Sequence, residues 1–205
     1  MNYIEFKEKL KSFPVFSLQE IRKIDLRFHR RRLNEWQEKG YIKKIIRGYY
    51  IFSDLALDDH VLFEIANRIY SPSYISCEMA LSYYSLIPES VYRITSVSTR
   101  KTYRFSTSIA EFSYRRMKPA LFFGYRLEKY GARFFKIAYP EKSILDYFYF
   151  HSQIKSAIDF ESLRLNASLF REIIDGDKLM NYLEKIQQKR LKRTIYSFME
   201  YMQNA

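Results

Sequence analysis

The stretch from Ser17 to Phe52 constrains the fold of this chain more than any other. It opens with the capping box Ser17-Leu18-Gln19-Glu20, in which the Ser17 side chain can accept from a backbone N–H while Glu20 reaches back to the cap. We expect a short helix to begin here and to end in a turn near Ile24. A short capped helix followed by a turn is how a helix-turn-helix begins.

A second, basic helix is predicted from Leu26 to Lys39. Asp25 can cap this helix, and Gly40 is suited to the left-handed conformation that stops a helix. On a helical wheel centred on Leu33, the side predicted to be buried also carries Leu26, His29, Trp36 and Gln37. The outward side carries Arg27, Phe28, Arg31, Glu35 and Glu38.

The outward side of this helix has cations near its N-terminal end and carboxylates near its C-terminal end. The helix dipole alone favours the opposite arrangement. A helix that enters the major groove with its N-terminal end accounts for it, because arginines there meet phosphates and guanine edges. Phe28 has two interpretations, contact with a thymine methyl group or cover for the helix turn.

Residues 41–52 follow as two β-rich runs joined at Arg47-Gly48, where glycine can supply the positive φ of a tight turn. We interpret this hairpin as a wing that offers cations to phosphates. An arginine run alone is more often a solvated helix face, but the ordered set of elements favours DNA binding. The predicted DNA-binding residues are Arg27, Phe28, Arg30, Arg31, Arg32, Lys43, Lys44 and Arg47.

The net charge of +12 is unevenly placed. Residues 1–53 hold 13 Lys or Arg against 6 Asp or Glu, a net charge of +7, which leaves +5 for the other three quarters of the chain. Positive charge therefore peaks in the predicted DNA-binding unit. The hydrophobic content of 47% excludes a disordered chain.

Several features favour a soluble, cytoplasmic protein without membrane contact. Cys77 is the only cysteine, so no intrachain disulfide can form. Residues 1–8 lack the apolar stretch of a signal peptide, and no run of about 18 apolar residues exists to span a bilayer.

We place the domain boundary after residue 53. Before the capping box, an opening helix is predicted from Ile4 to Phe13, ended by Pro14. After the boundary, Asp58 can cap a helix from Asp59 to Ile69, and another is predicted from Cys77 to Tyr84. The predicted domains are 1–53, a winged helix-turn-helix, and 54–205.

A strand-rich region follows within the second domain. The predicted strands are Val91–Thr99, Thr102–Ser106, Phe112–Arg116, Ala120–Leu127 and Arg133–Ala138, which favour a small, mostly antiparallel sheet. This region has its own cations, interpreted either as one solvated face or as a second nucleic-acid surface. They are Arg93, Arg100, Lys101, Arg104, Arg115, Arg116 and Lys118.

The chain ends in helices. One is predicted to begin at Pro140-Glu141-Lys142, and residues 155–205 are predicted as a helical tail. The tail helices are expected at Phe160–Asn166, Ser168–Ile174, Asp177–Gln187 and Arg190–Met202. The predicted fold class is α+β.

No motif for catalysis or cofactor binding is evident. The three histidines lie far apart without metal-ligand spacing, and the five glycines are scattered, so neither a metal site nor a phosphate loop is predicted. Glu141, Lys142 and Asp146 resemble the carboxylate and lysine set of a metal-dependent nuclease, but they stand at a helix start where Pro and Glu are expected anyway. We expect a protein without enzymatic activity.

The order of several motifs resembles the AbiEi family of antitoxins, from type IV toxin-antitoxin and abortive-infection systems of bacteria. The motifs are Gly40-Tyr41-Ile42, Arg47-Gly48-Tyr49-Tyr50, Ile65-Ala66-Asn67-Arg68, Ser71-Pro72-Ser73-Tyr74-Ile75-Ser76, Ala80-Leu81, Leu86-Ile87-Pro88 and Ala138-Tyr139-Pro140-Glu141-Lys142-Ser143-Ile144-Leu145-Asp146. They cover most of residues 1–150 and leave the helical tail unmatched.

The resemblance implies a repressor that binds inverted repeats in double-stranded DNA upstream of its own operon. It also implies a C-terminal domain that helps repression and neutralises a nucleotidyltransferase-like toxin without a stable complex. Inverted repeats need two DNA-binding units, supplied by a dimer or by two monomers. The alternatives are a regulator without a toxin, a module for RNA or protein, and, least favoured, a metal-dependent nuclease.

Overall fold

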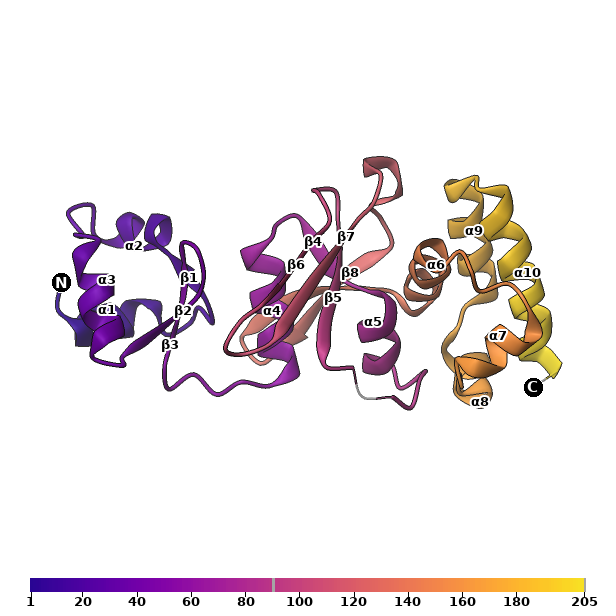
Figure 1. Cartoon of the computed structure of the whole chain (residues 1–205), viewed down its shortest axis with the longest axis horizontal. Helices are drawn as coiled ribbons and strands as arrows, with labels where there is room; N and C mark the ends of the chain where they lie inside the picture. Colours follow the sequence, from indigo (N-terminus) through magenta and orange to yellow (C-terminus); the bar gives the residue numbers. More distant parts are fainter. Residues whose placement is uncertain (90, 205) are drawn as a thin grey trace.

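The computed structural model describes residues 1–89 and 91–204 of an elongated α+β protein. An N-terminal unit lies at one end, a six-stranded sheet in the middle and a group of helices at the other end (Figure 1). The predicted second domain, 54–205, includes Ser90 and Ala205, which lie outside the described residues.

The N-terminal unit combines three helices with a small antiparallel sheet. Its strands lie in the order β1-β3-β2, and the capping box predicted at Ser17 and Glu20 is confirmed. Gly40 and Gly48 both have positive φ, as predicted at the end of the second helix and in the hairpin turn. The elements are α1 (Tyr3–Leu10), β1 (Phe16–Ser17), α2 (Leu18–Ile24), α3 (Arg31–Glu38), β2 (Ile42–Ile46) and β3 (Tyr49–Phe52).

The predicted start of the second helix at Leu26 is wrong, because α3 begins only at Arg31. Asp25 accepts from the Arg27 N–H at 3.1 Å within a turn. Phe28 then enters the core, where its ring lies 5.6 Å from that of Trp36. Burial of this aromatic ring holds the chain out of a helical path until Arg31.

The second unit is built on a six-stranded sheet in the order β6-β7-β5-β4-β9-β8. Three pairings are antiparallel, but β4 with β9 and β5 with β7 are parallel, so the sheet is larger and more mixed than predicted. The strands are β4 (Ser73–Ile75), β5 (Arg93–Ser98), β6 (Tyr103–Ser106), β7 (Glu111–Arg116), β8 (Tyr125–Tyr130) and β9 (Arg133–Ala138).

Two strands depart from the prediction. The strand expected from Ala120 is wrong at its start, because Pro119–Leu121 form a 3-10 helix and β8 begins only after Gly124, which has positive φ. Strand β4 was not predicted. It has three residues, all buried in the middle of the sheet, so it is too short to show an alternating pattern.

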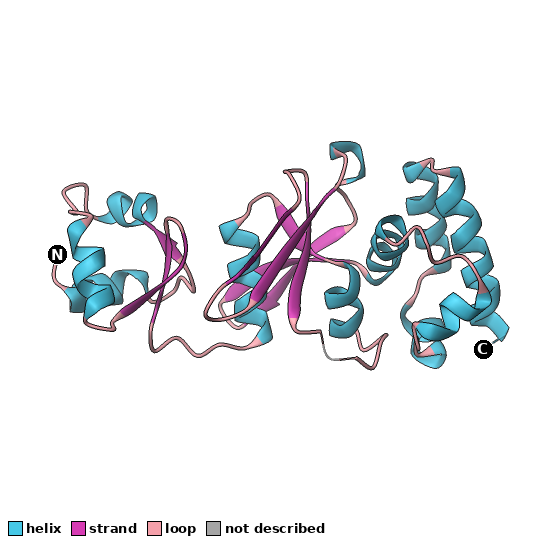
Figure 2. Ribbon diagram, viewed as in Figure 1, coloured by secondary structure: helices cyan, strands magenta, loops and turns pink. Residues whose placement is uncertain are grey.

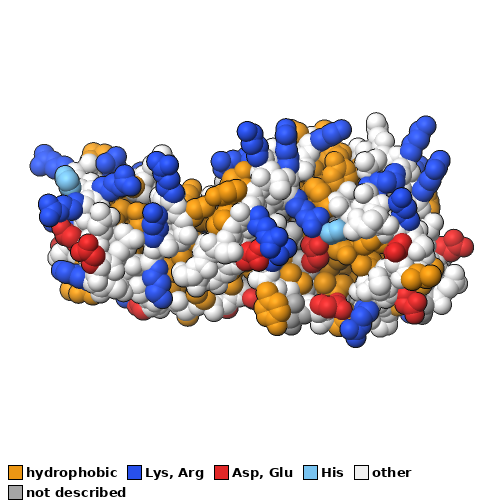
Figure 3. Space-filling model, in the orientation of Figure 1, with side chains coloured by type: hydrophobic (Ala, Val, Ile, Leu, Met, Phe, Trp, Pro, Cys, Tyr) orange, Lys and Arg blue, Asp and Glu red, His pale blue; other side chains and the backbone are white. Residues whose placement is uncertain are grey.

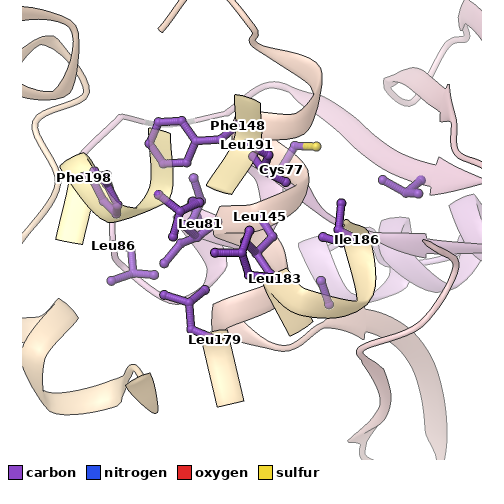
Figure 4. Close-up of a cluster of buried hydrophobic side chains, with 14 of the residues drawn as sticks. Cys77, Leu81, Leu86, Leu145, Phe148, Leu179, Leu183, Ile186, Leu191 and Phe198 are labelled. Atoms are coloured by element: carbon purple, nitrogen blue, oxygen red, sulfur yellow. The ribbon is translucent and has the colours of Figure 1, made fainter. Parts of the chain in front are cut away.

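Helices cover both faces of the sheet (Figure 2). Helix α4 (Asp59–Ile69) packs on one face, with Asp58 at its N-cap as predicted, while α5 (Cys77–Tyr83) and α6 (Pro140–Phe150) pack on the other. Helices α9 (Gly176–Ile186) and α10 (Lys189–Asn204) pack against α6, and α7 (Ala157–Ser162) and α8 (Ala167–Ile173) pack against α10. Leu145, Phe148, Leu183 and Phe198 meet in the core that joins these helices (Figure 4).

The two units share a hydrophobic cluster at their junction. Val15, Ile45 and Ile51 of the N-terminal unit are buried together with Val61 and Ile65 of α4. Apolar contact therefore crosses the boundary expected at residue 53. No helix among residues 1–89 and 91–204 combines the length and the apolar character needed to cross a membrane.

Candidate nucleic-acid interface

The surface at the start of α3 is basic and open to solvent. Arg27 and Arg30 lie in the turn before the helix, Arg31 and Arg32 form its first turn, and all four are exposed. Leu33 and Trp36 are buried as predicted and fix α3 on the core of the unit. The helix therefore keeps its cations on the side away from the core.

Few partners hold these cations. Arg32 donates to the Met1 carbonyl, and the Arg31 Nε lies 3.7 Å from Glu35 in a pair exposed on both sides. Within the described part of the chain, Arg27 and Arg30 form no ion pair. Exposed pairs contribute little free energy, so three of the four guanidinium groups are available to an anion.

The N-terminus of α3 adds the positive end of a helix dipole to this surface. Arg30 occupies the N-cap position without a side-chain capping hydrogen bond, and the N–H groups of Arg32 and Leu33 donate to the carbonyls of His29 and Arg30. The positive end of the dipole favours a nearby phosphate. The first turn of α3 thus combines side-chain charge and backbone dipole of the same sign.

The hairpin supplies a second group of cations. Lys43, Lys44 and Arg47 are all exposed, while Ile42 and Ile45 on the same hairpin are buried. Ile42 packs into the core of the N-terminal unit and Ile45 into the cluster at the junction, so Lys43 and Lys44 lie on opposite faces of the strand, and both are exposed. Seven of the eight predicted DNA-binding residues are therefore exposed.

Three other positions correct the helical wheel. Phe28, predicted to point outward, is only 4% exposed and stacks at 6.1 Å on Phe6. Leu26, predicted to be buried, is 88% exposed, and His29 is exposed as well. The cause is the late start of α3, because a wheel drawn through the turn assigns its side chains to the wrong sides.

Sequence reasoning passed over two further cations, Arg22 and Lys23 in the last turn of α2. Both are exposed. The signal was present as two adjacent basic residues directly before the turn. In Figure 3, Lys and Arg side chains stand out at several places on the N-terminal unit, and carboxylates are fewer there.

The seven cations of the strand-rich region divide into two groups. Three lie on strands and meet carboxylates: Arg93 and Arg104 both contact Glu111, and Arg115 lies 3.6 Å from Glu78. The other four lie at or after the ends of β5 and β7, with Arg116 as the last residue of β7, and these two ends lie together because the strands are parallel. They are Arg100, Lys101, Arg116 and Lys118, all exposed.

The predicted landmark around residues 140–146 is a buried polar cluster. Lys142 and Asp146 pair on successive turns of α6, with side chains 0% and 1% exposed. Asp146 also accepts from the Tyr74 hydroxyl at 2.9 Å and from Ser76 at 2.7 Å. Burial, followed by the Asp146 charge, raises the pKa of Tyr74 well above its usual value, so the phenol stays protonated.

The side chains of this cluster are closed to solvent. Its neighbour Glu141 is also buried and pairs with Lys178 of α9 at 3.0 Å. Among residues 1–89 and 91–204, no group of three or more His, Cys, Asp or Glu side chains could hold a metal ion. Glu141, Lys142 and Asp146 therefore have a structural role: their contacts connect α6 to β4 and α9.

Comparison with protein-family models and with curated protein sequences finds no match to this chain.

Proposed function

We propose that this protein is a DNA-binding transcriptional repressor with an N-terminal winged helix-turn-helix. The element order α1, β1, α2, α3, β2, β3 and the strand order β1-β3-β2 support this fold, in which α3 enters the major groove and the β2-β3 hairpin is the wing. The exposed cations at the start of α3 and on the hairpin are the observation that carries the proposal.

The proposed contacts follow from position. Arg31 is the first choice for a base edge, since it lies in the first turn of α3 and faces solvent. Arg27 and Arg30 in the preceding turn, and Lys43, Lys44 and Arg47 on the hairpin, contact phosphates. Phe28 is not among the proposed DNA contacts, because its side chain is buried in the core.

Repression of its own operon and neutralisation of a nucleotidyltransferase-like toxin complete the proposal. These two parts rest on the resemblance of the motif order to AbiEi antitoxins. In this account the second unit holds the surface that acts against the toxin. Inverted repeats in the promoter would bind either a dimer or two monomers side by side.

A gel-shift titration tests DNA binding. The protein is titrated against DNA from upstream of its own gene and against a scrambled fragment, at low and at moderate salt. Tighter binding to the upstream fragment that survives moderate salt supports the repressor. Equal, salt-sensitive binding to both fragments contradicts it, because sequence-independent phosphate contacts alone behave in that way.

Growth assays test the antitoxin part separately. The protein is expressed together with a nucleotidyltransferase-like toxin encoded beside it, and growth is compared with that of cells that express the toxin alone. Restored growth supports neutralisation. Unchanged toxicity with intact DNA binding contradicts it and leaves a regulator without antitoxin activity.

A further inference from the structure

A groove of about 520 Å³ lies at the junction of the two units. One side comes from the N-terminal unit, including Glu20, Lys23 and Tyr49, and the other from α4 and the β8-β9 hairpin. The groove lies where β9 extends past the start of the shorter strand β4. Because β4 pairs in parallel with β9 at Ile75 and Ile137 and begins only at Ser73, the first residues of β9 extend beyond it.

Two side chains on α4 line this groove with unused hydrogen-bonding atoms. Glu64 is 9% exposed, and its Oε1 accepts from Arg68 at 3.3 Å, while its Oε2 is buried without a partner. Asn67 accepts from the Lys136 backbone N–H at 2.5 Å through Oδ1, while its Nδ2 is buried without a partner. Unpaired buried polar atoms cost free energy, so each needs a complement.

The two unused atoms form one recognition pattern. Glu64 and Asn67 are three residues apart on α4, so they share a face of the helix, one with an unused acceptor and the other with an unused donor. Both atoms are closed to solvent, and the terminal torsions of Glu and Asn are broad enough for a ligand to turn them toward the groove in exchange for the hydrogen bonds with Arg68 and Lys136. Burial raises the pKa of Glu64, and Arg68 opposes this shift. Because burial disfavours the ionised carboxylate, an N–H donor that hydrogen-bonds to it would stabilise that form.

The walls of the groove are apolar and basic. Phe134 and Leu127 are 51% and 65% exposed, unusually open for such side chains. Glu20 and Arg68 pair with each other at 2.5 Å. Lys23 and Lys136 also line the groove, and within the described residues neither forms an ion pair. The free charge of the groove is therefore positive.

We propose that this groove binds a mononucleotide through the lactam edge of its base. The base N–H donates to Glu64, its neighbouring carbonyl accepts from Asn67, and its ring lies against Phe134. The phosphate lies toward Lys23 and Lys136, since their charge has no protein partner. A heterocycle with adjacent N–H and C=O groups matches the donor and acceptor order on α4.

Occupancy of this site would regulate the DNA-binding unit, an extension that rests on the proposed function. Glu20 accepts from the Ser17 N–H at 2.7 Å as part of the cap of α2 and also holds Arg68 of α4. The groove therefore adjoins the hydrogen bonds that set the angle of α2 against the second unit. A ligand that contacts both sides of the groove favours one arrangement of the N-terminal unit relative to the second unit.

Calorimetry with inosine 5′-monophosphate as the probe tests the site, with the full chain and no DNA present. We expect saturable binding, weakened about tenfold or more by the 1-methyl form of the same nucleotide, which lacks the N–H donor. Asn67→Asp should weaken it by a similar factor or more, because this variant keeps the acceptor for Lys136 but replaces the donor by a charged carboxylate oxygen, which repels the carbonyl of the base. Asn181→Asp, on the exposed surface of α9, is the matched control.

Three results would overturn the proposal. They are no saturable binding of the probe, equal binding of the methylated probe, and Asn67→Asp binding like Asn181→Asp. A folded Asn67→Asp variant that binds DNA poorly while the wild type ignores the nucleotide would assign the groove to DNA instead. Thermal melts of both variants establish that they fold.

A separate experiment tests whether nucleotide binding changes DNA affinity. DNA affinity is determined with and without saturating inosine 5′-monophosphate, and we expect a change of about fivefold or more in the wild type and none in Asn67→Asp. Nucleotide binding without any change in DNA affinity would overturn the regulatory part. Failure of the proposed function appears differently, as absent sequence preference in the gel shift with nucleotide binding intact.

Discussion

The N-terminal unit and the strands and core of the second unit use charged side chains in opposite ways, while Arg100, Lys101, Arg116 and Lys118 at the ends of β5 and β7 are exposed as well. In the N-terminal unit the core is apolar and seven candidate DNA-binding cations face solvent. In the second unit, strand cations such as Arg93 and Arg104 are held by a carboxylate. All the buried charged residues in the described part of the chain lie in the second unit: Glu64, Glu141, Lys142 and Asp146.

This difference separates charge that stabilises a fold from charge that is free for a ligand. A nearby carboxylate cancels much of the electrostatic potential of a cation. An exposed cation without such a partner attracts a phosphate more strongly. The net charge alone predicts affinity for nucleic acid in both units. The carboxylate partners of the strand cations in the second unit favour the N-terminal unit as the main interface.

The largest expected effect comes from breaking the buried pair of the second unit. Lys142→Met leaves the Asp146 carboxylate buried without its cation, and we expect a loss of about 4 kcal/mol in the free energy of unfolding. Chemical denaturation measures it. The double variant Lys142→Met, Asp146→Leu should recover a large part of the loss, and a single variant as stable as the wild type would contradict a structural role for the pair.

Removal of Phe28 tests the corrected core of the N-terminal unit. Phe28→Ala should cost about 3 kcal/mol, because it opens a cavity between Phe6 and Trp36. DNA affinity measured at low temperature, where the variant is folded, should stay unchanged. Full stability with weakened DNA binding would instead make Phe28 a base contact.

A smaller effect is expected at the junction of the two units. Glu20→Gln keeps an amide suited to the capping box but loses the ion pair with Arg68, and we expect a loss of about 1 kcal/mol. Glu8→Gln, which breaks an exposed pair with Lys11, is the control and should change stability little. Equal effects of the two substitutions would show that the junction contact adds nothing.

The smallest effect is a pH dependence in the second unit. Burial lowers the pKa of His151 from its ordinary value of 6.5, and Arg115 adds to this, while Glu78 opposes it. The unfolded chain therefore binds a proton at a higher pH than the folded one, so stability falls as the pH drops below 6.5. Thermal melts across this range should show a smaller fall for His151→Gln than for the wild type, and an equal fall in both proteins would contradict the effect of burial.

Features with local causes were predictable from the sequence. The caps at Ser17 and Asp58, the positive φ of Gly40 and Gly48, and the exposure of the hairpin cations follow from a few neighbouring residues.

Features that depend on distant contacts were not predictable. Strand β4 exists because β5 and β9 pair on either side of it, and Phe28 leaves the predicted helix because Phe6 and Trp36 bury it. The unused atoms of Glu64 and Asn67 depend on how α4 packs on β9, a contact between segments far apart in the sequence.

The salt dependence of DNA affinity tests the central claim most directly. Binding to the upstream fragment is measured over a range of salt concentrations for the wild type, for Arg27→Ala with Arg30→Ala, which removes two proposed phosphate contacts, and for Arg93→Ala with Arg104→Ala. The slope of log affinity against log salt should decrease by about 2 for the first double variant and stay unchanged for the second, since only the former removes free cations. The opposite order, or equal slopes for all three proteins, would contradict the assignment of DNA binding to the N-terminal unit.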